Sequence, residues 1–230
     1  MKSSVLNTVK FLILIILNIA INLAPMFLVK YQVAMRSEVR WLAALAYGAI
    51  VVLVIVWLWK WHQKGTSADH QKQRMRWKDI GVLLLFYLVG RVVAIVGTVA
   101  NQLFSGNQLS VNDQAIFGFE EGLRGSFLPF TIYFLLVVGL VAPIIEELIF
   151  RGLASQLLFN GSHKWLVGLT SSLLFAIPHS TNIIEGMMYF ALGVVFYLAY
   201  IRRGNIKDSI GLHMLNNLPA AFLLAYKIFF

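Results

Sequence analysis

The sequence predicts an all-α fold, a polytopic membrane bundle of about seven to eight transmembrane helices. Hydrophobic residues make up 59% of the 230 residues and charged residues only 13%, and the mean hydropathy is +0.77. These values lie far outside the usual balance of a water-soluble globular domain. Seven spans of about 20 residues would use roughly 140 positions, close to the apolar content of the chain. We therefore expect a single integral membrane domain over residues 1–230.

The apolar segments follow one another with short polar gaps between them. They cover residues 11–29, 41–59, 80–100, 127–145, 165–178, 183–201 and 208–226, with a further apolar stretch at 148–159. The first segment follows Lys2 and Lys10 as a signal peptide would, but its length and its two asparagines, Asn18 and Asn22, favour a retained anchor. These asparagines are four residues apart, so they share a helix face and are expected to hydrogen-bond to another helix. The six tryptophans cluster at segment ends, which is typical of the lipid–water interface.

Charge favours one membrane orientation. The net charge is +9, but all Lys and Arg except Arg91 and Arg151 lie in the gaps, as expected beside anionic lipid, so we expect no nucleic-acid partner. With the N-terminus inside, the inner gaps hold twelve Lys and Arg residues and the outer gaps five. We therefore expect a multi-pass protein of the cell membrane with a cytoplasmic N-terminus. The absence of cysteine excludes a thiolate nucleophile, a disulfide framework and a Cys-ligated metal.

Candidate functional groups are concentrated in residues 127–226, which we take as the motif-bearing catalytic core. Ionisable groups inside a bilayer are costly, so they mark functional sites by default. Three motifs carry them here, with the sequences Glu146-Glu147-x-x-x-Arg151, Phe175-x-x-x-His179 and His213-x-x-x-Asn217.

The spacing within two motifs suggests distinct roles. Glu147 and Arg151 are four residues apart, so they share a helix face and can form an ion pair that lowers the cost of burying both. Glu146 points elsewhere and is left without that partner, which suits a general base. His213 and Asn217 also share a face and together can present two hydrogen-bond donors to one oxygen.

Depth along the helices indicates that these groups meet. From a turn expected at residues 160–164, Glu146 and His179 lie about 21 and 22 Å away at the helical rise per residue. From a turn near residue 205, His213 and Asn217 lie about 12 and 18 Å away. All four side chains are therefore expected to converge in one intramembrane cavity.

Two further expectations concern single residues. Pro143 is expected to break or kink the long helix over residues 127–159, so that the glutamates lie in the first turns of a new helix. Arg91, inside an apolar segment, either binds a substrate carboxylate or lipid phosphate or neutralises a buried acid such as Glu185. Three histidines are expected in solvated loops, namely His62, His70 and His163.

The ordered set of motifs resembles the CAAX protease and bacteriocin-processing family, also called CPBP or Abi proteins. The resemblance covers roughly residues 140–220, and all three motifs are matched in full. It implies a helical bundle, often of eight spans, and a metal-independent, glutamate-type intramembrane endopeptidase that needs no cofactor.

The resemblance also implies roles for the matched residues. Glu146 and His179 would activate the attacking water, and His213 and Asn217 would form the oxyanion site. The supporting positions are Glu147 and Arg151. This division suits peptide hydrolysis, which needs a base for water, a proton for the leaving amine and donors for the tetrahedral oxyanion.

The implied partners are a peptide or membrane-protein substrate and the lipid bilayer, with a bacteriocin or its receptor as a further partner in self-immunity or peptide processing. Three alternatives stay open at this point. A metal-dependent membrane protease would use Glu146, Glu147, His179 and His213 as ligands, since carboxylate and imidazole suit zinc and other divalent ions. A non-catalytic membrane immunity or binding protein would use the polar cluster to lock its helices together. A transporter would use the carboxylates as a proton relay.

Overall fold

In the computed structural model, residues 2–159 and 162–230 are described, and every regular element among them is a helix. The α-helices are α1 (Lys2–Tyr31), α2 (Ser37–Lys64), α3 (Ala68–Lys72), α4 (Trp77–Ser105), α5 (Val111–Phe117), α6 (Glu120–Leu123), α7 (Leu128–Leu136), α8 (Ala142–Glu147), α9 (Ala154–Phe159), α10 (Lys164–Ala176), α11 (Ile183–Arg203) and α12 (Ile206–Phe229). The shorter elements are 3-10 helices η1 (Gln32–Ala34) and η4 (Ile177–His179) and π-helices η2 (Val137–Val141) and η3 (Leu148–Leu153). The expected turn at residues 160–164 begins outside the described residues.

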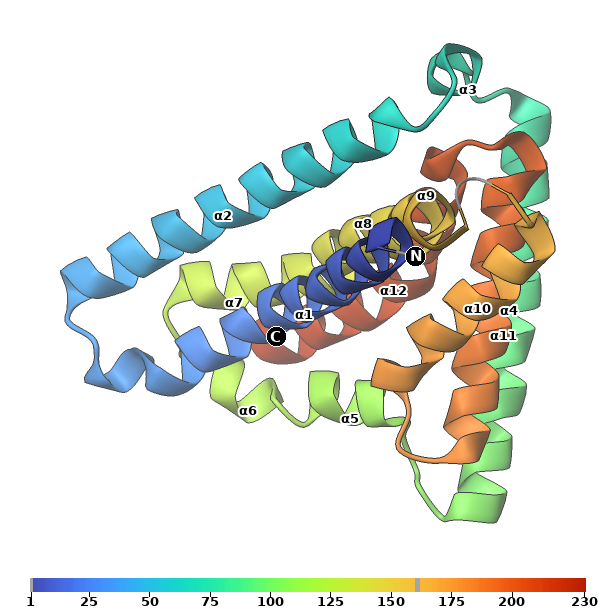
Figure 1. Cartoon of the computed structure of the whole chain (residues 1–230). Helices are drawn as coiled ribbons and strands as arrows, with labels where there is room; N and C mark the ends of the chain where they lie inside the picture. The colour runs from blue at the N-terminus through green and yellow to red at the C-terminus, as the bar shows by residue number, and fades with distance from the viewer. Residues whose placement is uncertain (1, 160–161) are drawn as a thin grey trace.

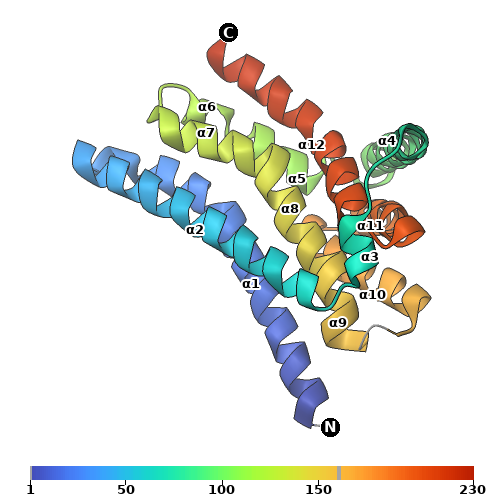
Figure 2. The same cartoon turned by 90° about the horizontal axis from the view of Figure 1, so that it is seen from above.

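The helices form two groups around a central segment that runs from α7 to α9. α1 and α12 both pack against this central segment, and α2 turns back alongside it. α4, α10 and α11 lie side by side in both views (Figures 1 and 2). α12 contacts both α11 and α4, so it connects the two groups. The central segment is therefore enclosed by helices that are distant from it in sequence.

The central segment is continuous from Leu128 to Phe159, although Pro143 lies within it. Proline has no N–H to donate and crowds the preceding helical turn, so it normally ends or distorts an α-helix. Here Pro143 is the second residue after the π-helical turn η2, and a second π-turn, η3, begins after Glu147. The expected break at Pro143 therefore does not occur, because the helical segment is continuous, but the helix is irregular there, with a π-turn before α8 and another after it. Glu146 and Glu147 lie in the middle of a long helical segment, between two π-turns of the kind often found at functional sites.

Among the described residues, five helical segments are long and apolar enough to cross a membrane. They are Ser4–Ala34, Ser37–Lys64, Trp77–Ser105, Leu128–Phe159 and Ile183–Arg203. The expected count of seven to eight is not reached by this measure, for two physical reasons. α10 has only 13 residues, about 20 Å at the helical rise. α12 has 24 residues but carries the polar groups of the third motif and charges near both ends, which lower its hydropathy.

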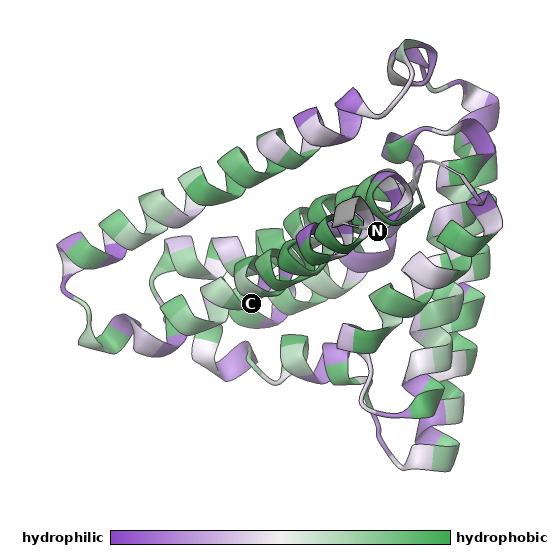
Figure 3. Cartoon of the chain, in the orientation of Figure 1, coloured by the Kyte–Doolittle hydropathy of each residue, from purple (hydrophilic) through white to green (hydrophobic). Residues whose placement is uncertain are grey.

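Apolar side chains cover much of the outer surface. Large hydrophobic residues along α1, α2 and α4 are exposed, among them Leu45, Leu53 and Leu85. Figure 3 shows hydrophobic colour along these helices and hydrophilic colour at α3 and at helix ends. Such a surface would be unfavourable in water but matches lipid tails, so the chain is a multi-pass membrane protein.

Candidate active site

Glu146 lies in α8 and is only 3% exposed. Its Oε1 accepts a hydrogen bond from Asn22 Nδ2 at 3.1 Å and a longer one from Asn18 Nδ2 at 3.5 Å, both from α1. The same oxygen lies 3.9 Å from His179 Nε2, and Oε2 lies 3.8 Å from His213 Nε2. As expected, Arg151 pairs with Glu147 and not with Glu146 among the described residues, and three other elements bring polar groups to the Glu146 carboxylate.

His179 ends the short 3-10 helix η4, which follows directly from α10. Its Nδ1 lies 2.7 Å from the carbonyl oxygen of Phe175. A carbonyl can only accept, so Nδ1 carries the proton and the opposite nitrogen, Nε2, is directed toward Glu146. The phenylalanine of the second motif also stacks on the imidazole, with ring centroids 4.6 Å apart. The motif thus fixes both the tautomer and the orientation of the histidine.

His213, on α12, is oriented from the other side. Its Nδ1 lies 2.9 Å from Glu147 Oε1, so it donates to that carboxylate and Nε2 faces Glu146. Phe196 stacks on its ring with centroids 4.4 Å apart. A carboxylate behind a histidine is a common way to hold the ring in one tautomer.

Glu147 and Arg151 form the ion pair that their spacing predicts. Arg151 Nε lies 3.3 Å from Glu147 Oε2, and both side chains are fully buried. Arg151 also donates to the carbonyl of Gly193 at 3.0 Å, and its guanidinium lies 4.7 Å from the ring centre of Phe175. The pair therefore lies behind His213 and Phe175, and both of those side chains line a cavity within the bundle.

Asn217 is on the same face of α12 as His213, and both line the cavity. One N–H of Asn217 donates to the carbonyl of Val138 at 3.2 Å, within the π-turn η2. An amide nitrogen carries two N–H groups, so this contact orients the side chain and leaves a second donor on the same atom. Asn216, its neighbour, donates to Asn217 Oδ1 at 3.3 Å.

These groups share one cavity with a volume of about 620 Å³. It is lined by Glu146, His179, His213 and Asn217, together with Asn22 and apolar side chains from α4, α11 and α12. The expected convergence of the four motif residues is thus what the structure shows. Glu147 and Arg151 are not among the lining residues. A mostly apolar pocket with a few convergent polar groups is the usual form of a ligand-binding site.

The sequence did not identify Asn18 and Asn22 as part of the site. Their hydrogen bonds to another helix were expected and are present, but the acceptor is Glu146 itself. The sequence shows two asparagines four residues apart in an apolar segment, but this pattern does not indicate which residue accepts their hydrogen bonds.

Arg91 lines the same cavity and donates to Asn216 Oδ1 at 3.5 Å. Glu185, its proposed counter-charge, instead accepts hydrogen bonds from Asn101, from the Thr181 backbone and hydroxyl, and from the Val111 backbone. Within the described residues Arg91 has no ion pair with Glu185, so that acid is not its counter-charge. Its positive charge instead acts on the carboxyl of Asp113, which lines the same cavity.

His62 was also expected in a solvated loop, but it is buried at the end of α2 against Gly152. Across the described parts of the chain, no group of three His, Cys, Asp or Glu side chains is arranged to hold a metal ion.

The chain is similar to membrane proteases. A family model described as Type II CAAX prenyl endopeptidase Rce1-like matches residues 128–219. The membrane-embedded CAAX protease MroQ of Staphylococcus aureus is 32% identical over 142 residues, which are 59% of this chain and 53% of that protein. The putative membrane peptidase YdiL of Bacillus subtilis is 29% identical over 143 residues, 60% of this chain and 55% of that protein.

A third relative is covered more fully. The UPF0177 protein YbdI of Lactococcus lactis is 33% identical over 149 residues, 63% of this chain and 76% of that protein. By contrast, the match spans only about half the length of the first two relatives. No solved structure matches the chain.

Proposed function

The chain belongs to the Rce1-like CAAX protease family, and from that premise we propose that it is a metal-independent membrane endopeptidase in which Glu146 activates the attacking water. One observation carries this proposal: the Nε2 atoms of His179 and His213 face the two oxygens of one buried carboxylate, at 3.9 and 3.8 Å. A water molecule hydrogen-bonded to both Glu146 Oε1 and His179 Nε2 fits the distance between those atoms. Glu146 and His179 therefore act together on the nucleophile.

The peptide bond is cleaved by addition and elimination. Glu146 takes a proton from the water as its oxygen attacks the scissile carbonyl carbon, and the carbonyl oxygen becomes an oxyanion. Glu146 then returns the proton to the leaving amine, so the products are a free carboxylate and a free amine. Positioned acid–base groups of this kind contribute roughly 10²–10⁴-fold to a rate.

The oxyanion is stabilised by His213 and by the second N–H of Asn217. This role requires a proton on His213 Nε2 as well as on Nδ1, with the carboxylates of Glu146 and Glu147 as counter-charges. The contacts that orient these side chains, to Glu147 and to the Val138 carbonyl, support a preorganised pair of donors. Glu147 and Arg151 are positioning residues, because they act through His213.

We place this chemistry in a catalytic core of residues 127–226 within a single membrane domain of residues 1–230. We further propose that the protein lies in the cell membrane with its N-terminus in the cytoplasm, supported by the distribution of Lys and Arg between the segments. A role in bacteriocin self-immunity or peptide processing rests on the family resemblance, and a bacteriocin or its receptor would be the corresponding partner.

The proposal is tested by peptide cleavage with the purified chain in nanodiscs, using a panel of hydrophobic peptides followed by mass spectrometry. Wild type, Glu146→Gln and His179→Ala are compared, each with and without a metal chelator. Cleavage by wild type alone, unaffected by the chelator, is the expected result. Loss of wild-type activity with the chelator would instead favour a metalloprotease. If wild type cleaves nothing while both variants keep the cellular phenotype, the chain is a binding protein.

A further inference from the structure

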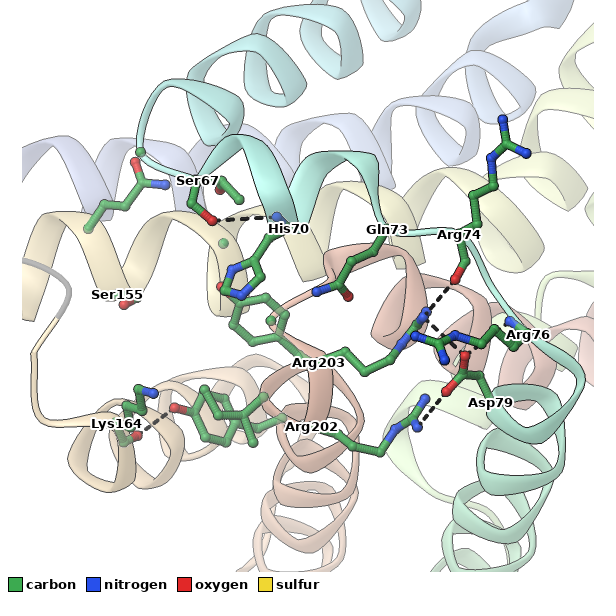
Figure 4. Close-up of a pocket in the computed structure, with 18 of the residues that line it drawn as sticks. Ser67, His70, Gln73, Arg74, Arg76, Asp79, Ser155, Lys164, Arg202 and Arg203 are labelled. Carbon is green, nitrogen blue, oxygen red and sulfur yellow. Dashed lines mark hydrogen bonds and ion pairs between the residues drawn. The ribbon is translucent and has the colours of Figure 1, made fainter.

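We propose that a second, polar cavity at one end of the bundle binds the phosphate group of an anionic phospholipid. This cavity has a volume of about 970 Å³. Its walls come from the segment between α2 and α4, from η3 and α9, from the start of α10 and from the end of α11 (Figure 4). The described residues that line it are a different set from those that line the catalytic cavity. The proposal therefore does not depend on proteolysis.

The cavity carries a strong excess of positive charge. Its basic lining residues are Arg74, Arg76, Lys78, Lys164, Arg202 and Arg203. Among its described lining residues, Asp79 supplies the one carboxylate. Like charges gathered in a hollow repel one another, and this repulsion is relieved when an anion enters.

Two of the arginines are fixed by buried acids. Arg202 Nη1 lies 2.8 Å from Asp79 Oδ1, and Arg203 Nη2 lies 2.6 Å from Asp208 Oδ1. Each arginine also contacts the other aspartate, at 3.2 Å in both cases. These four side chains cross-link α4, α11 and α12. Their two positive and two negative charges balance, so the excess positive charge of the cavity comes from its other basic residues.

The remaining four cations have no ion pair within the described residues. Figure 4 shows Arg74 directed outward, away from the Asp79 cluster, and Lys164 on the opposite wall. Ser67 and Ser155 add hydroxyl groups to the lining. Phosphate oxygens accept hydrogen bonds from both kinds of donor, so the lining chemistry fits a phosphate group.

Tryptophans place this cavity at the depth of lipid headgroups. Trp77 directly follows Arg76, and Trp165 directly follows Lys164; their side chains are 89% and 74% exposed. Exposed tryptophans at the ends of apolar helices are typical of the membrane interface. The cavity also lies where the span Trp77–Ser105 begins and the span Ile183–Arg203 ends. The phosphate best placed to enter is therefore that of a phospholipid headgroup.

The test uses the full chain in a neutral detergent. Native mass spectrometry and melting curves are recorded with dioctanoyl phosphatidylglycerol, with dioctanoyl phosphatidylcholine and with glycerol 3-phosphate, at equal concentration and ionic strength. The test variant is Arg76→Gln/Lys78→Gln/Lys164→Gln. The matched control is Lys10→Gln/Lys60→Gln/Lys64→Gln, which removes the same charge from exposed positions that do not line the cavity.

Wild type and the control should bind phosphatidylglycerol saturably and at least tenfold more tightly than phosphatidylcholine, and the test variant should lose this preference. Equal binding of the two lipids by wild type would overturn the proposal, whether or not the test variant folds. So would an unchanged preference in a folded test variant, or the same loss in the control. If glycerol 3-phosphate gives the same shift as the lipid, the ligand is a soluble phosphate and the lipid assignment is wrong.

Discussion

Removing one member of the buried Glu147–Arg151 pair should destabilise the bundle more than removing both. At 3.3 Å and an effective dielectric constant of about 20, the attraction between the two charges is about 5 kcal/mol. Glu147→Gln leaves a fully buried guanidinium without its counter-charge, so it should lower the free energy of unfolding by about 3–5 kcal/mol.

The double variant Glu147→Gln/Arg151→Met removes both charges. It also removes the hydrogen bond from Arg151 to the Gly193 carbonyl, which costs about 1–3 kcal/mol when the acceptor stays buried. The free energy of unfolding of the double variant should therefore be about 2 kcal/mol higher than that of Glu147→Gln.

The assay is equilibrium unfolding in mixed detergent–SDS micelles, followed by tryptophan fluorescence. Glu120 and Arg124 provide a matched control, because they are also four residues apart and paired, at 2.9 Å, but lie at the surface. Glu120→Gln should have a much smaller effect than Glu147→Gln. The reasoning is refuted if the two single variants behave alike, or if the double variant is no more stable than Glu147→Gln.

Three further predictions concern other contacts. Asn22→Leu, which removes the 3.1 Å hydrogen bond to Glu146, should lower kcat by roughly tenfold to a hundredfold with little change in KM; unchanged peptide cleavage would contradict a positioning role. Gly152→Ala would place a methyl carbon 2.7 Å from His62 Nδ1, and this overpacking should cost about 1–3 kcal/mol in the same unfolding assay. Burial raises the pKa of the Asp113 carboxyl above its ordinary value of 3.8, so stability falls as the pH rises from that ordinary value to the raised one and stays reduced above it. Asp113→Asn should therefore melt above wild type at pH 7 and lose this advantage near pH 4; a pH-independent difference would contradict this reasoning.

Local geometry accounts for what could be predicted from the sequence. The ion pair of Glu147 with Arg151 follows from a four-residue spacing on one helix. The convergence of Glu146 and His179 follows from the constant rise of a helix, because residues equally far from a shared turn reach equal depth.

Tertiary packing accounts for what could not be predicted. The hydrogen bond between Asn22 and Glu146 joins residues 124 positions apart, and no local pattern specifies that α1 lies against α8. Pro143 was expected to break or kink the helix, as a proline in a regular α-helix does, but no local pattern in the sequence predicts the π-turns on either side of α8. The predicted number of spans is not confirmed, because length and hydropathy alone do not separate short or polar helices, such as α10 and α12, from lipid-facing ones.

The most direct test of the central claim is the cleavage rate of Glu146→Gln relative to wild type, measured on the same peptide in the same nanodiscs. This change keeps the shape of the side chain and removes the base. The account predicts a loss of at least about a hundredfold in kcat, with a melting curve close to that of wild type. A Glu146→Gln protein that cleaves at the wild-type rate would contradict the assignment of Glu146 as the base.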